Sequence, residues 1–144
     1  MTEASRELLA SRKDVWRFLA EPNHLTDWWP GVRGVEPDRR GFSAGARWGV
    51  FTADRSFGFG LPSGSALGRT VPGTLVITGI VPLERWSWQL VRRGRFRPDT
   101  FAVDIRLEAT APERTLVTVC APGRGVARLA VDRLYDLVQT AAGL

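Results

Sequence analysis

Cysteine and histidine are almost absent from this sequence, which has one of each, Cys120 and His24, among 144 residues. A single cysteine excludes an internal disulfide, and one cysteine with one histidine is too few for a zinc site of familiar spacing. We therefore expect no metal and no cofactor, and we expect Cys120 to be a buried structural thiol. A histidine-based proton transfer would have to use His24.

Several motifs are missing as well. The sequence has no phosphate-binding loop, no paired-carboxylate motif and no GxSxG elbow, and Gly58-Phe59-Gly60 alone is too weak to indicate nucleotide binding. No segment approaches 18 consecutive apolar residues, and the first residues lack a basic region followed by an apolar stretch. We therefore expect a cytoplasmic protein without membrane insertion. Its length fits a single domain over residues 1–144, present as a monomer or homodimer.

Lysine is nearly missing too, since Lys13 is the only lysine among twenty basic residues, which together with fifteen acidic residues give a net charge of +5. So strong a preference for arginine indicates a GC-rich genome rather than selection for phosphate binding. The arginines are scattered, and acidic residues lie near the two local clusters, Arg39-Arg40 and Arg92-Arg93-Gly94-Arg95. Because basic charge alone indicates solubility and loose association, we expect no nucleic-acid partner.

Large aromatic residues, in contrast, are plentiful. The chain has six tryptophans and seven phenylalanines against one tyrosine. These side chains bring large apolar area with few polar groups, which indicates a large apolar core or a lined apolar cavity.

The first thirty residues predict one strand and two short helices. The strand covers residues 3–10, the first helix 12–20 and a second helical turn 24–29. Ser11 is the expected N-cap of the first helix, with Asp14 in place of the usual Glu of a capping box. Pro22 ends that helix because it disfavours the helical region for the residue before it. Asn23 is expected to cap the second turn.

From residue 32 the pattern alternates as in β-strands. Strands are predicted near 32–38, 46–53, 74–81, 85–90, 100–110 and 115–120. Alternation places Trp48 with Val50 on one face, and Trp86 with Trp88 and Leu90 on one face. It also places Phe101, Val103, Ile105, Leu107 and Ala109 together. One face of this sheet is therefore buried and the other is wet, with Asp104, Arg106 and Glu108 on the wet face.

Two further segments complete the chain. Residues 124–142 carry apolar side chains at helical spacing, which predicts one amphipathic helix of about five turns. Residues 54–73 are rich in Gly and Ser and include the apolar Phe57 and Phe59. Loops this long are usually functional or mobile, so 54–73 is a candidate lid.

The order of these elements is the helix-grip arrangement, and several motifs resemble the SRPBCC superfamily. This superfamily is also called START-like and includes the Bet v 1-like birch-pollen-allergen and polyketide-cyclase branches. The matching pieces are Asp14-Val15-Trp16-x-x-Leu19, Trp28/Trp29-Pro30-Gly31-Val32, Gly45-x-x-Trp48, Pro82-Leu83-Glu84-Arg85-Trp86-Ser87-Trp88 and the C-terminal helix. The predicted fold class is α+β. A curved antiparallel sheet of about six or seven strands wraps a long C-terminal helix, and two short helices follow the first strand.

The resemblance implies a cavity between the sheet and the long helix that binds a small hydrophobic molecule such as a lipid, quinone or polyketide. The residues predicted to line it are Trp28, Trp48, Val50, Phe57, Phe59, Trp86, Trp88 and Phe101. For any one of them, packing in an ordinary core is the simpler explanation. Three inward tryptophans on neighbouring strands favour a lined pocket.

Three polar residues are candidates for chemistry in such a cavity. His24 lies in the second helical turn, where a solvent-exposed role is the alternative. Tyr135 flanks the apolar stripe of the last helix, and its hydroxyl points either into the cavity or into water. Arg69 would hold an enolate or carboxylate, as an arginine does in polyketide-cyclase relatives.

Two functions remain open at this point. One is a cyclase, aromatase or dehydratase-like enzyme of secondary metabolism, which works by positioning a reactive apolar chain. The other is a carrier or binding protein without chemistry. Behind these two stands a third hypothesis, a chaperone-cofactor or regulatory module. If His24, Tyr135 and Arg69 all point away from the cavity, the cyclase reading loses its residues.

Overall fold

The computed structural model of the protein describes residues 2–53, 70–92 and 98–141. Its strands are β1 Thr2–Leu8, β2 Val32–Glu36, β3 Arg47–Ala53, β4 Thr70–Val81, β5 Arg85–Arg92, β6 Asp99–Ala111 and β7 Arg114–Ala121. Its helices are α1 Arg12–Ala20, the 3-10 turn η1 Pro22–His24, α2 Leu25–Trp28 and α3 Val126–Ala141. None of the helices in the described ranges is long and apolar enough to cross a membrane.

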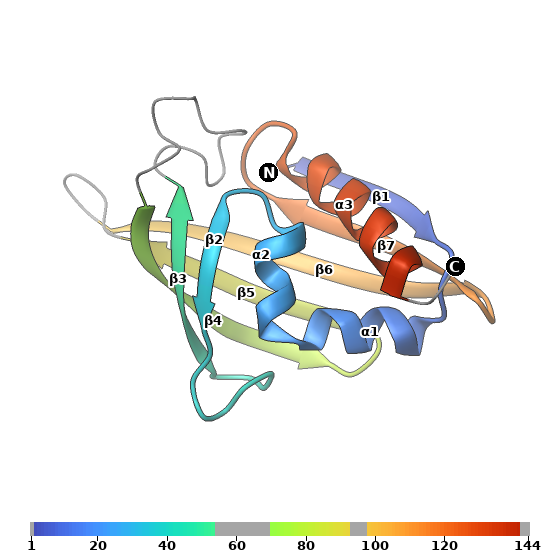
Figure 1. Ribbon diagram of the computed structural model, residues 1–144, viewed down its shortest axis with the longest axis horizontal. Coiled ribbons are helices and arrows are strands. Elements are labelled where there is room, and N and C mark those ends of the chain that lie inside the picture. The colour runs from blue at the N-terminus through green and yellow to red at the C-terminus, as the bar shows by residue number, and fades with distance from the viewer. Residues whose placement is uncertain (1, 54–69, 93–97, 142–144) are drawn as a thin grey trace.

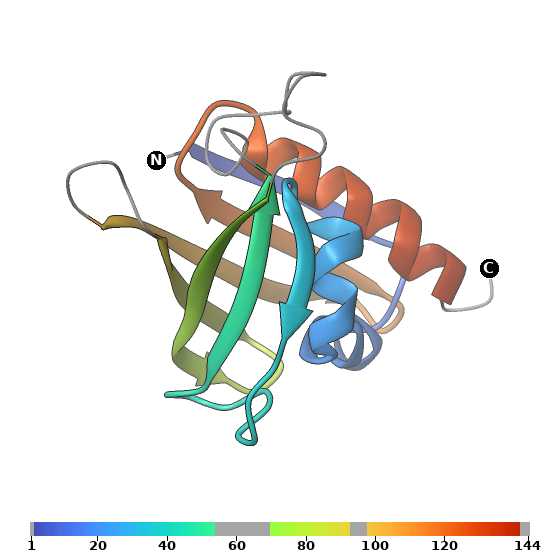
Figure 2. The ribbon, with the colours of Figure 1, turned by 60° about the vertical axis from the view of Figure 1, so that its left-hand side comes forward.

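The strands form one antiparallel seven-stranded sheet in the order β1-β7-β6-β5-β4-β3-β2. Figures 1 and 2 show that this sheet is curved and that α1, α2 and α3 lie on its concave side. We call this side of the sheet the inner face. α3 packs along β1 and β7, and α2 lies between α3 and β2. The core therefore lies between the inner face and the helices.

The predicted alternation of buried and exposed residues is confirmed along the central strands. On β5, Trp86, Trp88 and Leu90 are buried while Arg85 and Gln89 are exposed. On β6 the burial of alternate residues continues from Phe101 to Leu107, as expected, but the predicted inward residue Ala109 is exposed. The pairing of β6 with β7 shifts register between Ala109 and Ala111, where the hairpin ends.

The capping predictions for the two N-terminal helices have different outcomes. The Ser11 hydroxyl accepts a hydrogen bond from the Asp14 backbone N–H at 3.2 Å, as predicted. The prediction for Asn23 is wrong, because the second helical segment begins earlier, at Pro22. The Glu21 carboxylate is the cap and accepts from the Asn23 backbone N–H at 3.2 Å. Proline at the first helical position is favourable, since its missing N–H would have no partner there.

Part of the candidate lid 54–73 is a strand rather than a loop. β4 begins at Thr70 and pairs with β3, with Thr70 opposite Ala53 and Gly73 opposite Val50. The sequence pattern did not predict this part of the strand, because proline and glycine, here Pro72 and Gly73, usually mark strand ends. The rest of the predicted lid, with Phe57, Phe59 and Arg69, lies outside the described residues.

The prediction of a buried structural role for Cys120 is wrong. Its neighbours Val119 and Ala121 are buried on the inner face, so Cys120 lies on the outer face and is half-buried. Its Sγ is 3.2 Å from Glu3 Oε2. Burial and the hydrogen bond to the Glu3 carboxylate raise the pKa of the thiol, which makes it a poor nucleophile.

Candidate functional site

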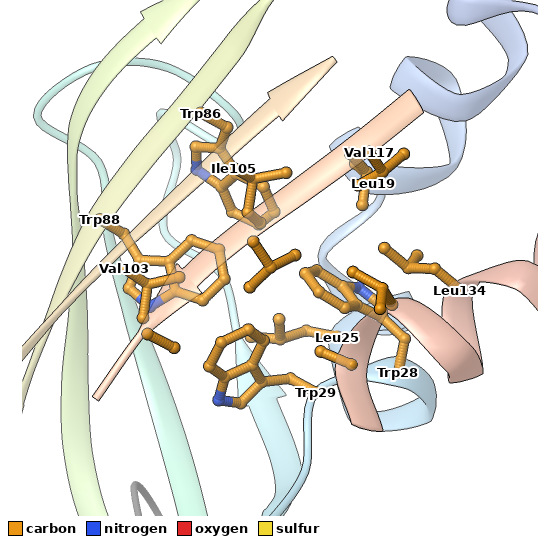
Figure 3. Close-up of a cluster of buried hydrophobic side chains, with 14 of the residues drawn as sticks. Leu19, Leu25, Trp28, Trp29, Trp86, Trp88, Val103, Ile105, Val117 and Leu134 are labelled. Carbon is orange, nitrogen blue, oxygen red and sulfur yellow. The ribbon is translucent and has the colours of Figure 1, made fainter. Parts of the chain in front are cut away.

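A cluster of five tryptophans occupies the space between the sheet and the helices. Trp28 and Trp29 come from the end of α2, Trp48 from β3, and Trp86 and Trp88 from β5, and each is at most 1% exposed. Figure 3 shows four of these rings gathered together beside side chains of α1, α2 and α3. The ring centroids of Trp86 and Trp88 are 4.4 Å apart, and those of Trp29 and Trp88 are 5.1 Å apart.

The end of α2 explains how two consecutive tryptophans both face inward. Successive residues in an α-helix point about 100° apart, so a continuing helix would turn one of the pair away. α2 ends at Trp28, and Trp29 has extended backbone angles, φ −87° and ψ 121°. Gly31 then adopts φ 87°, a conformation that favours glycine, and leads into β2. The two rings meet edge to face at 5.4 Å.

The four tryptophans predicted to line a cavity instead pack against one another in the core. Trp48 and Trp86 are 5.8 Å apart, Trp28 and Trp88 are 6.2 Å apart, and Val50 is buried beside them in the same core. Aromatic pairs at these separations contribute about 0.5–1.5 kcal/mol each beyond their buried area. The tryptophans thus act as core in this structure.

Two pockets with described walls lie elsewhere. One, of about 770 Å³, is lined by outer-face residues that include Arg85, Arg106 and Thr118. The other, of about 340 Å³, lies where β4 begins and β5 ends, beside Pro72 and Arg92.

The tryptophans differ in whether the indole N–H group has a hydrogen-bond acceptor. Trp48 Nε1 donates to the Gly41 carbonyl at 2.8 Å. The Nε1 atoms of Trp86 and Trp88 are buried and have no hydrogen-bond acceptor in the described part of the chain. Each buried donor without an acceptor costs about 1–3 kcal/mol, and such groups are few in native proteins.

Arg92 adds a third unpartnered donor on the same strand. It follows Trp86, Trp88 and Leu90 at alternate positions of β5, and its side chain is only 10% exposed. Its Nη1 atom is buried and has no acceptor within residues 2–53, 70–92 and 98–141. Its guanidinium carbon lies 5.4 Å from the ring centroid of Phe101, and its Nε lies 3.9 Å from Asp99 Oδ2. That last distance is too long for a hydrogen bond.

His24 is held by backbone and ring contacts at the corner between α1 and α2. Its Nδ1 lies 2.8 Å from the Phe18 carbonyl, and its ring stacks on the Phe18 ring at 4.1 Å. Because a carbonyl can only accept, Nδ1 carries the hydrogen. These contacts fix the orientation of the half-buried imidazole.

Tyr135 is held at a different place, where α3 packs on β1. The Arg6 guanidinium carbon lies 3.7 Å from the centre of the Tyr135 ring, and Arg6 also forms a 2.8 Å ion pair with Asp132 of α3. The contacts of His24 and Tyr135 have no residue in common. Of the three predicted polar residues, Arg69 lies outside the described part of the chain.

Sequence reasoning missed Arg92 and Trp29. Arg92 was recognised in the sequence only as part of a local arginine cluster, although the alternation from Trp86 through Leu90 already places it on the inner face. Trp29 is buried against Trp88 because α2 ends one residue earlier, and no pattern in the sequence marks that end to the residue.

Comparison with known proteins identifies the fold. No protein-family model matches the sequence, and no curated protein is similar to it in sequence. Among solved structures, a Nitrosomonas europaea protein is similar with a TM-score of 0.67 and 19% identity, over 99% of this chain and 96% of its own. Truncated norcoclaurine synthase from Thalictrum flavum is similar with a TM-score of 0.66 and 14% identity, over 95% of this chain and 91% of its own.

A second structure of norcoclaurine synthase from Thalictrum flavum, in complex with dopamine and hydroxybenzaldehyde, is similar with a TM-score of 0.65 and 15% identity. It covers 96% of this chain and 86% of the synthase chain. At such identities the likeness concerns the fold alone. The predicted α+β helix-grip fold, also called Bet v 1-like, is confirmed.

Proposed function

We propose that this protein is a binding or carrier protein for a small, largely apolar aromatic molecule, with the whole chain acting as one domain. The ligand occupies the inner face of β5, between the sheet and the helices. The observation that carries this proposal is the pair of buried indole N–H groups of Trp86 and Trp88, which have no acceptor among the residues that the structure describes.

The choice of tryptophan at these two positions supports a ligand. Phenylalanine would supply aromatic packing without a buried polar group, whereas each unpaired indole N–H destabilises the folded chain by about 1–3 kcal/mol. A ligand with a carbonyl, ether or hydroxyl oxygen recovers that cost by accepting from Trp86 or Trp88. A mostly apolar pocket with a few placed polar groups is the usual form of a small-molecule site.

The tight packing of the rings defines how the ligand enters. The tryptophan rings contact one another, so binding requires some of them to move. Trp28 is the last residue of α2, a helix of four residues, and Trp29 directly follows it, whereas Trp86 and Trp88 lie on a central strand. The ligand therefore displaces the α2 tryptophans and packs on the β5 tryptophans.

The comparisons support this ligand class. The fold is that of a superfamily whose resemblance implies a cavity for hydrophobic molecules, and one similar structure is a complex with dopamine and hydroxybenzaldehyde. Both are small aromatic molecules with oxygen acceptors. Stacking on indole rings together with hydrogen bonds from indole N–H groups suits such molecules.

No observation favours catalysis of the polyketide-cyclase type over binding. Such a reaction needs polar groups that converge on one point of the substrate. Within the described ranges, His24 is bound to Phe18 and Tyr135 is covered by Arg6, at separate places in the fold.

Tryptophan fluorescence titrated with aromatic polyketides, quinones and fatty acids tests the proposal. Trp88→Phe should weaken the binding of oxygen-bearing aromatic ligands about tenfold, because one hydrogen bond in the complex is lost. Trp48→Phe is the matched control, since the Trp48 indole already donates to Gly41. It should change the affinity less than threefold. Absence of any response to the whole panel would contradict the proposal, as would equal effects of the two variants.

A further inference from the structure

We infer that the ligand is an organic acid, whose anionic group binds Arg92 while its aromatic body extends along β5 toward Trp88 and Trp86. This inference rests on the proposed function and adds the charge and the orientation of the ligand. It assigns Arg92 as the residue that selects acids over neutral molecules.

The position of Arg92 sets the orientation. Inner-face positions on a strand are about 6.6 Å apart, so Arg92 lies about 13 Å from Trp88 and about 20 Å from Trp86 along the backbone. A long arginine side chain covers part of that distance. A ligand with two or three rings is therefore long enough to reach both Arg92 and Trp88.

The described contacts of Arg92 involve its Nε and the plane of its guanidinium, and they leave Nη1 without an acceptor. Its guanidinium lies 5.4 Å from the face of the Phe101 ring, a contact that stabilises the cation. Asp99 approaches only the Nε side, at 3.9 Å, and its side chain is 46% exposed. The buried Nη1 has no acceptor. A carboxylate, sulfonate or enolate oxygen at Nη1 would accept a hydrogen bond and form an ion pair with the guanidinium, whereas a neutral ligand could accept the hydrogen bond but not form the ion pair.

The strand next to Arg92 is shaped to accommodate it. Gly73 of β4 is the residue paired with Arg92. A side chain at Gly73 would place its Cβ 3.2 Å from the Arg92 Cβ and 3.1 Å from the Val91 carbonyl oxygen. Glycine at this position therefore leaves the Arg92 side chain its space on the inner face.

The arginines on the outer face of the sheet differ from Arg92 in exposure and in hydrogen bonding. Arg85 and Arg106 are more than half exposed, and each donates through Nε to an oxygen of Asp104, at 2.7 and 2.8 Å. Their charges are hydrated and paired. Arg92 combines burial with an unpartnered nitrogen, and that combination points to a ligand.

Two fluorescent probes that share one ring system test the inference. 1-Anilinonaphthalene-8-sulfonate carries a permanent negative charge, and N-phenyl-1-naphthylamine is the same molecule without the sulfonate. Both become brighter in apolar sites, so their Kd values can be measured by direct titration. We expect Arg92→Met to weaken binding of the sulfonate probe at least about tenfold and of the neutral probe less than about threefold.

Two further variants keep the test decisive. Arg85→Gln removes a positive charge from the outer face of the same strand and should leave both Kd values unchanged. Asp99→Asn removes the carboxylate that competes for Arg92 and should tighten the sulfonate probe about two- to threefold, without affecting the neutral probe. Asp99→Asn tests the inference even if Arg92→Met does not fold, which circular dichroism would reveal.

The possible outcomes separate the inference from the proposed function. If both probes bind and Arg92→Met weakens them equally or not at all, the ligand-binding function stands and the assignment of Arg92 is overturned. If Arg85→Gln weakens the sulfonate probe as much as Arg92→Met, the selection of acids is a surface-charge effect and the inference is overturned. If neither probe binds the wild-type protein, the proposed function and the inference fail together.

Discussion

The polar groups on the two faces of β5 differ in their hydrogen bonding. On the outer face, Asp104 accepts hydrogen bonds from Arg85 Nε at 2.7 Å, Ser87 Oγ at 2.7 Å and Arg106 Nε at 2.8 Å. On the inner face, Trp86 and Trp88 have buried donors without acceptors, and so does Arg92. These outer-face side chains have hydrogen-bond partners, whereas the three inner-face donors have none among the described residues.

This difference distinguishes a structural network from a binding surface. Donors at the outer face could be satisfied by water, yet they have protein partners. Donors at the inner face cannot reach water and carry the cost of burial. A chain under selection for stability alone would replace the inner donors with apolar groups, so we attribute their presence to ligand binding.

Truncation on the inner face should be the most damaging change. Trp88→Ala removes a fully buried ring that contacts Trp28, Trp29 and Trp86, and it should lower the free energy of unfolding by about 3–5 kcal/mol. Gln89→Ala, on the outer face of the same strand, should change it by less than about 0.5 kcal/mol. Urea denaturation measures both values. A loss below about 1 kcal/mol for Trp88→Ala would mean that the ring is not part of the core.

Loss of the outer-face carboxylate should have an intermediate effect. Asp104→Asn weakens three hydrogen bonds, two of them to arginine, and should lower the free energy of unfolding by about 1–3 kcal/mol. Burial by itself would raise the pKa of Asp104, but hydrogen bonds from Ser87, Arg85 and Arg106 outweigh it and hold the pKa below its ordinary value.

The same carboxylate predicts a pH dependence with a defined sign. Because the pKa of Asp104 is lower in the folded state, its stabilisation is complete above its ordinary pKa of about 3.9 and is lost as the pH falls below that value. The stability difference between wild type and Asp104→Asn should therefore be constant from pH 5 to 7, on the order of the value above, and shrink in more acidic solution. A difference that grows toward acid would contradict the assigned network.

Replacing a tryptophan by phenylalanine should have a smaller effect on the free energy of unfolding, and the effect should differ between Trp48 and Trp88. Trp88→Phe removes an unpaired donor, a gain that offsets part of the lost packing, whereas Trp48→Phe also breaks the 2.8 Å bond to Gly41. We expect Trp48→Phe to be the more destabilising of the two by about 0.5–1.5 kcal/mol in urea denaturation. The reverse order would mean that the Trp88 N–H is satisfied in solution.

The smallest expected effect concerns the reactivity of the Cys120 thiol on the outer face. Its raised pKa, due to burial and to the Glu3 carboxylate, should make its alkylation by iodoacetamide at pH 8 slower than that of a free cysteine. Glu3→Gln should accelerate the reaction, about two- to threefold, because it removes the nearby negative charge. Equal rates in the two proteins would show that Glu3 does not affect the thiol.

The sequence alone was enough to predict the architecture because local patterns determine it. Alternation identified the inner face of β5 and β6, and helical spacing identified α3, although α3 begins at Val126 rather than at residue 124. Gly125 adopts φ 78° just before it, a conformation that does not belong to a helix. The start of β4 was missed because Pro72 and Gly73 resemble a strand end.

The candidate site was less predictable because its decisive contacts are long-range. The Arg6 side chain covers the Tyr135 ring and forms an ion pair with Asp132. Arg6 and Asp132 are 126 positions apart in the sequence, and no local pattern reveals such a pair. Whether Trp48 or Trp88 has an acceptor also depends on tertiary packing. Arg92, in contrast, could have been found by extending the alternation of β5 by two residues.

The most direct test of the account is the nuclear magnetic resonance spectrum of the indole N–H groups during titration with 1-anilinonaphthalene-8-sulfonate or with an aromatic ligand from the fluorescence panel. The account predicts that the Nε1–H signals of Trp86 and Trp88 move downfield as they gain an acceptor, while the signal of Trp48, already bonded to Gly41, stays in place. Shifts confined to Trp48 or to backbone amides on the outer face of the sheet would contradict it.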